Sequence, residues 1–81
     1  MTGRSSRRDV RNPLLALPAF AELQRLAPDA RRALRRVLMS LSADAGDRAE
    51  RSWRRKKAPM AVYWKGVSVY AKHAARGLRD A

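Results

Sequence analysis

The chain has 81 residues, and its 19 Lys and Arg against seven Asp and Glu leave a net charge of +12. This length allows one small domain at most, and the absence of cysteine excludes disulfides and thiolate metal sites. Charged residues interrupt every apolar run before it reaches the ~18 residues of a membrane span, and the first residues lack the apolar segment of a secretory signal, so we expect a cytoplasmic protein without a membrane partner.

Residues 1–11 have the composition of a tail. They hold Gly, Ser, Thr and four arginines, and their one large aliphatic residue is Val10. Such a segment buries too little apolar surface to order itself. The sequence therefore predicts a flexible basic arm over residues 1–11 and a single small helical domain over residues 12–81.

A short helical piece follows the arm. Asn12 before Pro13 is typical of a helix N-cap followed by proline at the first helical position, and Pro18 opens a second short segment. That segment has three apolar residues at helical spacing, which we expect to point inward together: Phe20, Leu23 and Leu26.

A long helix is predicted from Pro28 to about residue 57. Its apolar stripe has steps of mostly three and four residues and consists of Leu34, Val37, Leu38, Leu41 and Ala45. Gly46 costs roughly 1 kcal/mol relative to Ala inside a helix. Acid-to-Arg pairs spaced four residues apart offset that cost, each by ~0.2–0.5 kcal/mol; they are Asp44–Arg48, Asp47–Arg51 and Glu50–Arg54. We favour one helix, with a break at Ser42–Gly46 as the alternative.

Residues 59–79 allow two interpretations. Their aromatic and β-branched residues favour strands that turn at Lys65-Gly66. A longer helical stripe favours a helix that starts at Pro59, and it consists of Met60, Trp64, Val67, Ala71, Ala74 and Leu78. The opposite, basic face would hold Lys65, Ser68, Lys72, Arg76 and Arg79. A lone hairpin is marginal in water, so the sequence predicts a helix and an all-α fold.

The joint between the two long helices is short. If only Ala58 and Pro59 separate them, a close antiparallel pairing over the full length is difficult. Either the helices then cross at a steep angle, with residues 18–26 filling the gap, or a second copy of the chain completes the core. A homodimer is therefore one expected outcome.

The residue types indicate binding rather than catalysis. One histidine and no cysteine leave no ligand set with metal-binding spacing, and no glycine-rich phosphate loop is present. His73 has no visible nucleophile or carboxylate as a partner, and a solvated or core-edge position suits it better. Trp53 and Trp64 are predicted as core or interface anchors, whereas Tyr63 and Tyr70 suit a core edge and an exposed contact equally. We expect no enzyme and no cofactor.

Clusters of cations are the candidate binding residues. One cluster lies early in the long helix, a second lies at its end, and further cations follow on the last helix. They are Arg31, Arg32, Arg35, Arg36, Arg54, Arg55, Lys56, Lys57, Lys65, Lys72 and Arg76. Few acids lie near them, and a cationic helix with an arginine arm beside it is a common way to hold nucleic-acid backbone.

Two segments, NPLLALP and KKAPMAVYWKGVSVYAKH, resemble small basic proteins from prophage and mobile-element regions of high-GC bacteria. The resemblance extends over most of residues 12–78 and identifies no residue role. It implies a helical fold and a place in a phage or mobile-element programme.

Two functions remain open. The first is a non-enzymatic module that binds DNA or RNA through the phosphate backbone. The second is an inhibitor of the anti-CRISPR kind, or an adaptor, that binds an acidic surface of a host protein complex.

Overall fold

The computed structural model describes residues 12–79, so the predicted basic arm, residues 1–11, lies outside the described residues. The elements in chain order are the 3-10 helix η2 (Pro13–Ala16), α2 (Pro18–Gln24), α3 (Pro28–Arg54) and α4 (Ala58–Arg79). Within this range there is no strand, which confirms the all-α prediction. The alternative hairpin is wrong, because Lys65-Gly66 lies inside α4.

Prolines mark where the helices begin. Pro13, Pro18 and Pro28 are the first residues of η2, α2 and α3. A proline suits this place because the first N–H groups of a helix have no partner within the helix. In α4 the helix starts one residue earlier than predicted, at Ala58, and Pro59 takes the second position.

Asn12 does not cap η2 with its side chain, contrary to the prediction. Its side-chain amide instead donates a hydrogen bond of 2.7 Å to the backbone carbonyl of His73 in α4. Its own carbonyl accepts a bond from the N–H of Leu15. Asn12 therefore ties the N-terminal segment to the last helix.

α3 runs through Gly46 without interruption, so the favoured single helix is confirmed and the break at Ser42–Gly46 is wrong. The helix ends at Arg54, three residues before the predicted end. Lys56 adopts a left-handed conformation with φ of 61°. The N–H groups of Lys56 and Lys57 bond back to the carbonyls of Trp53 and Ser52, as in a Schellman C-cap. Glycine usually occupies this left-handed position. Because a lysine occupies it here, the residue types give no sign of the turn.

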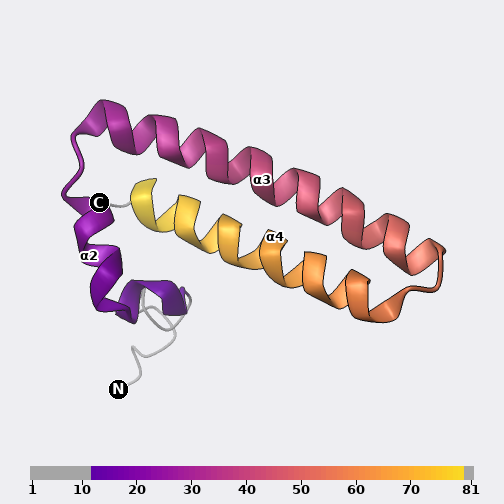
Figure 1. The fold of residues 1–81 in the computed structure, drawn as a ribbon. Helices are drawn as coiled ribbons and strands as arrows, with labels where there is room; N and C mark the ends of the chain where they lie inside the picture. Colours follow the sequence, from indigo (N-terminus) through magenta and orange to yellow (C-terminus); the bar gives the residue numbers. More distant parts are fainter. Residues whose placement is uncertain (1–11, 80–81) are drawn as a thin grey trace, which may run out of the picture.

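α3 and α4 lie side by side as an antiparallel hairpin (Figure 1). The expected steep crossing is wrong, because the Schellman turn adds residues 55–57 to the joint and reverses the chain tightly. The two short N-terminal elements lie across the open end of the hairpin (Figure 1). The shortest extent of the molecule, 17 Å, is less than half of the other two, 40 and 37 Å, so the molecule is flat.

Small side chains line the seam between the two long helices. The buried small residues are Ser42, Ala45 and Ala49 from α3 and Ala61, Ala71 and Ala75 from α4, and the larger Leu78 is buried towards the end of α4. Small side chains let two helix backbones approach closely. Ser68 belongs to this seam rather than to the basic face, where we expected it, because its hydroxyl donates to the carbonyl of Ser42 at 2.9 Å.

Several large apolar residues expected in the core lie outside it. Val37, Leu41 and Met60 are exposed, whereas Leu34, Leu38, Trp64 and Val67 are half-buried. The predicted stripes were therefore off-centre by part of a helix turn. Their centre lies on the alanines and serines, which hydrophobicity alone ranks below leucine and valine.

Phe20 anchors the N-terminal segment and is 6% exposed. Its ring packs against Gly77 of α4, where an added Cβ would come within 2.6 Å of the ring and within 3.0 Å of Leu15. Phe20 thus points inward as predicted, and Leu23 is half-buried. Leu26 lies beyond the end of α2 and is exposed.

None of the helices in residues 12–79 is both long enough and apolar enough to cross a membrane.

Candidate nucleic-acid interface

Three arginines from two helices converge on one side of the hairpin. Arg35 and Arg36 of α3 and Arg76 of α4 line a hollow of about 530 Å³, together with Met39, Ser40 and Ala75. The antiparallel pairing creates this convergence, because it places the early part of α3 beside the late part of α4. The sequence indicated these cations as candidates but gave no sign that they meet.

Two lysines extend the same side of α4. Lys72 and Lys65 precede Arg76 by four and eleven residues, which are close to whole numbers of helical turns. Both lysines are exposed. We call the set Arg35, Arg36, Lys65, Lys72 and Arg76 the basic flank. Most of its cations lie towards the open end of the hairpin, and Lys65 extends the set towards the turn.

Arg31 and Arg32 differ from their neighbours. Both line a smaller hollow that also includes Arg35. Arg31 is half-buried and donates a hydrogen bond of 3.3 Å to the carbonyl of Gln24, so it braces the joint between α2 and α3. Arg32 pairs with Asp29 one turn earlier. The four arginines predicted to act together therefore divide into a brace, a paired cation and two members of the basic flank.

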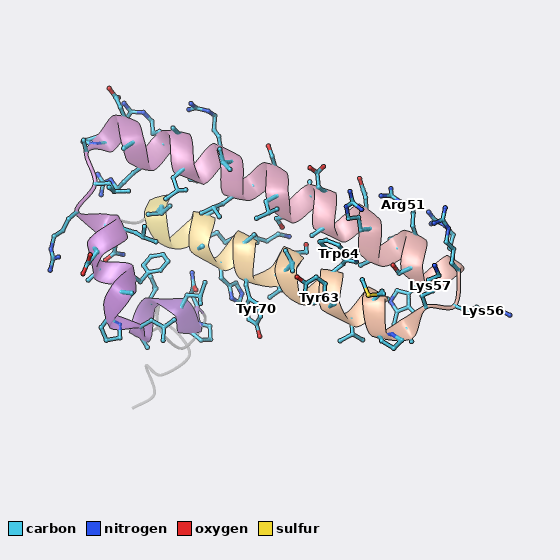
Figure 2. The ribbon with its side chains drawn as sticks, in the orientation of Figure 1. Arg51, Lys56, Lys57, Tyr63, Trp64 and Tyr70 are labelled. Atoms are coloured by element: carbon cyan, nitrogen blue, oxygen red, sulfur yellow. The ribbon has the colours of Figure 1, made fainter. Side chains whose placement is uncertain are left out.

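The cations at the turn of the hairpin also lie in different surroundings. Arg54 lies 3.7 Å from Glu50, the expected ion pair. Lys56 points away from the molecule at the tip, whereas Lys57 lies beside the start of α4 (Figure 2). Arg55 and Lys57 line a hollow at the tip of the hairpin that they share with side chains of both helices.

This tip hollow brings in residues that sequence reasoning missed. It has a volume of about 180 Å³ and is lined by Arg48, Arg51, Ser52, Arg55, Lys57, Met60 and Trp64. Arg48 and Arg51 were expected to pair with Asp44 and Asp47, but within the described residues neither pair forms. The steps of three and four residues from Arg48 to Arg51 and Arg55 were a usable signal, since they place all three on one helix face.

An aromatic cluster supports the tip hollow. The guanidinium carbon of Arg48 lies 5.2 Å from the centre of the Trp64 ring, within reach of a cation–π contact. Tyr63 meets Trp64 edge-on, with ring centres 5.1 Å apart. Trp64 is half-buried as an anchor residue would be, whereas Trp53, also predicted as an anchor, is 56% exposed.

The side opposite the basic flank carries exposed apolar residues next to the tip hollow. Residues two apart on a helix point about 200° apart, so Val37 and Leu41 lie across α3 from Met39. Exposed apolar residues on the corresponding side of α4 are Met60, Tyr63 and Tyr70, spaced three and seven residues apart. We call the set Val37, Leu41, Met60, Tyr63 and Tyr70 the apolar flank. The exposed Tyr63 and Tyr70 (59% and 64%) suit a contact surface better than a core edge.

The cationic and aromatic side chains of this surface are of types that can bind anions and stack on aromatic rings. Across residues 12–79, no three His, Cys, Asp or Glu side chains come close enough together to hold a metal ion. His73 is half-buried at the contact with Asn12, as a core-edge histidine would be. Comparison of the chain with protein-family models, curated proteins and solved structures finds no match.

Proposed function

We propose that this protein binds nucleic acid through the phosphate backbone, as a non-enzymatic module, with the basic flank as its contact surface. The observation that carries the proposal is the convergence of Arg35, Arg36 and Arg76 on one hollow. Cations from two helices on one rigid surface lose little entropy when they bind. The net charge of +12 adds long-range attraction for any polyanion.

The composition of the flank favours backbone contacts over base readout. Arginine can bind phosphate with two parallel hydrogen bonds, and phosphate contacts position a protein without reading sequence. The flank lies on the outer sides of two paired helices and does not project as one isolated helix into a groove. We therefore expect binding that depends strongly on salt and weakly on sequence.

A salt titration tests the proposal. Fluorescence anisotropy with labelled duplex DNA, single-stranded DNA and RNA should show log Kd rising linearly with log salt, by about 0.9 per duplex phosphate neutralised. The variant Arg35→Ala, Arg36→Ala, Arg76→Ala should weaken binding to every sequence and flatten the slope by about two to three units. Arg31 stays unchanged because it braces the fold.

A matched control separates this surface from net charge. The variant Arg25→Ala, Arg54→Ala, Lys56→Ala also removes three cations, but these lie outside the basic flank and the tip hollow. Compared with the triple variant of the basic flank, it should retain more of the affinity and a steeper dependence of log Kd on log salt. Equal effects of the two variants would show that total charge, not the basic flank, drives binding. Absence of binding at low salt would defeat the proposal.

The second candidate is an inhibitor, similar in role to an anti-CRISPR, or an adaptor that binds an acidic surface of a host protein complex. The exposed Tyr63 and Tyr70 favour it, because tyrosine is enriched where proteins meet. A pull-down from nuclease-treated host extract tests this candidate. A partner that wild type retains, and that Tyr63→Ala with Tyr70→Ala loses, would support it.

The apolar flank also supports a homodimer in solution. A hairpin of two helices has no third layer over its second side. A second copy would cover the part of the apolar flank around Val37, Leu41 and Tyr70 and would leave the tip with Met60 and Tyr63 open. In such a dimer the basic flanks would face outward on both sides. Each copy would then present its cations to the nucleic acid.

A further inference from the structure

The tip hollow lies apart from the basic flank and has a different chemistry. Four cations surround it, Arg48, Arg51, Arg55 and Lys57, and none of the described residues that line it carries a carboxylate. Its volume of about 180 Å³ is below the ~300 Å³ at which pockets for drug-sized ligands begin. The hollow therefore suits a small, highly charged anion.

Backbone groups reinforce this preference for an anion. Lys57 and Met60 flank the start of α4, a helix of 22 residues whose first N–H groups carry partial positive charge. The adjacent C-terminus of α3 would oppose this effect, but its last carbonyls accept bonds from the N–H groups of Arg55, Lys56 and Lys57. The start of α4 thus adds to the positive field of the four cations.

The turn at Lys56 positions two of these cations. Its left-handed conformation, with φ of 61°, is one that a lysine adopts at a cost, whereas glycine adopts it freely. Here the strained turn holds Arg55 and Lys57 on the two sides of the reversal, so that both reach the same hollow.

We infer that the tip hollow binds a phosphate monoester at the end of a single-stranded nucleic acid. A monoester carries about −1.5 to −2 at pH 7, whereas an internal phosphodiester carries one negative charge, so four cations favour the strand end. Tyr63 is exposed next to Trp64 and offers a ring on which the terminal base can stack. This inference rests on the proposed function only for the claim that the phosphate belongs to a nucleic-acid strand.

Matched oligonucleotides test it. Short single-stranded DNAs of one sequence, with a 5′-phosphate, a 3′-phosphate or hydroxyls at both ends, are titrated by anisotropy at fixed salt. One of the two phosphorylated strands should bind about tenfold more tightly than the strand with hydroxyls at both ends. A tenfold gain corresponds to about one additional charge-assisted contact. Equal binding of all three strands would overturn the inference.

Variants on one helix provide the control. Arg51→Ala and Lys57→Ala should each remove most of the preference for the phosphorylated end. Arg54→Ala lies three residues after Arg51, is paired with Glu50 and does not line the hollow, so it should leave the preference intact. The triple variant of the basic flank should weaken all three strands alike. Loss of the preference in Arg54→Ala alone would overturn the inference.

A small-molecule titration separates the two proposals if no strand binds. In a Trp53→Phe protein, Trp64 is the one remaining tryptophan, and its emission reports on the hollow. Methyl phosphate should change that emission in a saturable way, and dimethyl phosphate, a monoanionic diester, should change it much less. Saturation with methyl phosphate that Arg51→Ala abolishes would support the site even if the proposed function fails. No response to methyl phosphate would overturn the site.

Discussion

Single residues decide where the elements of this chain meet. Gly77 is the clearest case, because the ring of Phe20 occupies the space that any larger side chain would need. Gly66 lies on the same helix, but the nearest atom to an added Cβ there is a Tyr70 ring carbon at an ordinary 3.9 Å. The two glycines therefore differ in role although the sequence presents them alike.

These two positions give opposite predictions. Gly66→Ala should raise the free energy of unfolding by about 0.5–1 kcal/mol, the helix-propensity difference. Gly77→Ala should lower it by about 1–2 kcal/mol, because displacing Phe20 costs more than propensity returns. Urea unfolding followed by circular dichroism measures both. Stabilisation by Gly77→Ala would mean that the N-terminal segment does not pack on α4.

The turn of the hairpin shows what residue types cannot reveal. A glycine at position 56 would have indicated a C-cap and would have predicted the end of the long helix at this point. Lys56 carries no such signal, so α3 was expected to run to residue 57 and the joint was expected to be too short. The error in the crossing angle follows from that one residue.

At the scale of elements, the hairpin is held by a seam of small residues. Ser42 and Ser68 exchange hydrogen bonds, each hydroxyl donating to the other's backbone carbonyl at 2.8 and 2.9 Å. Ser42 is buried, so its hydroxyl depends on this partner. The exchange fixes the register of α3 against α4. That register in turn places Arg35 and Arg36 beside Arg76.

A double-mutant cycle tests the exchange. Ser42→Ala and Ser68→Ala should each lower the free energy of unfolding by about 1 kcal/mol. The double variant should cost less than the sum by roughly 0.5 kcal/mol or more, since the hydroxyls also contact each other at 3.2 Å. Additive costs would show that the two serines act independently of one another.

Periodicity predicted the elements better than their facing sides. Prolines and three- and four-residue steps identified α2, α3 and α4, because these signals act within one segment. Which side of α3 meets α4 depends on close approach of the two backbones, and alanine and serine permit it where leucine does not. The candidate cations could be named from the sequence, but their grouping into a basic flank and a tip hollow depends on the register of the two helices.

At the scale of the whole molecule, the flat shape leaves the apolar flank uncovered and raises the question of whether two copies associate. The apolar flank holds side chains as exposed as Val37, at 62%, and Tyr70, at 64%. Scattered exposed apolar residues are ordinary, but a gathered set marks a contact surface. A second copy of the chain is the partner that needs no other component.

Sedimentation equilibrium tests this assembly. Wild type should form a dimer at micromolar concentration, and Val37→Glu with Tyr70→Glu should make it monomeric without loss of helical circular dichroism. The exposed positions of both residues mean that the monomer should still fold. A monomeric wild type over the whole concentration range would contradict the dimer.

The basic flank is the central claim, and the most direct test maps it residue by residue. Proton–nitrogen correlation spectra of the labelled protein are recorded during titration with short duplex DNA at low salt. We predict that the largest shift changes fall at Arg35, Arg36, Lys65, Lys72 and Arg76, and that Tyr70 and Val37 change little. Changes gathered on the apolar flank, or none at saturating DNA, would contradict the account.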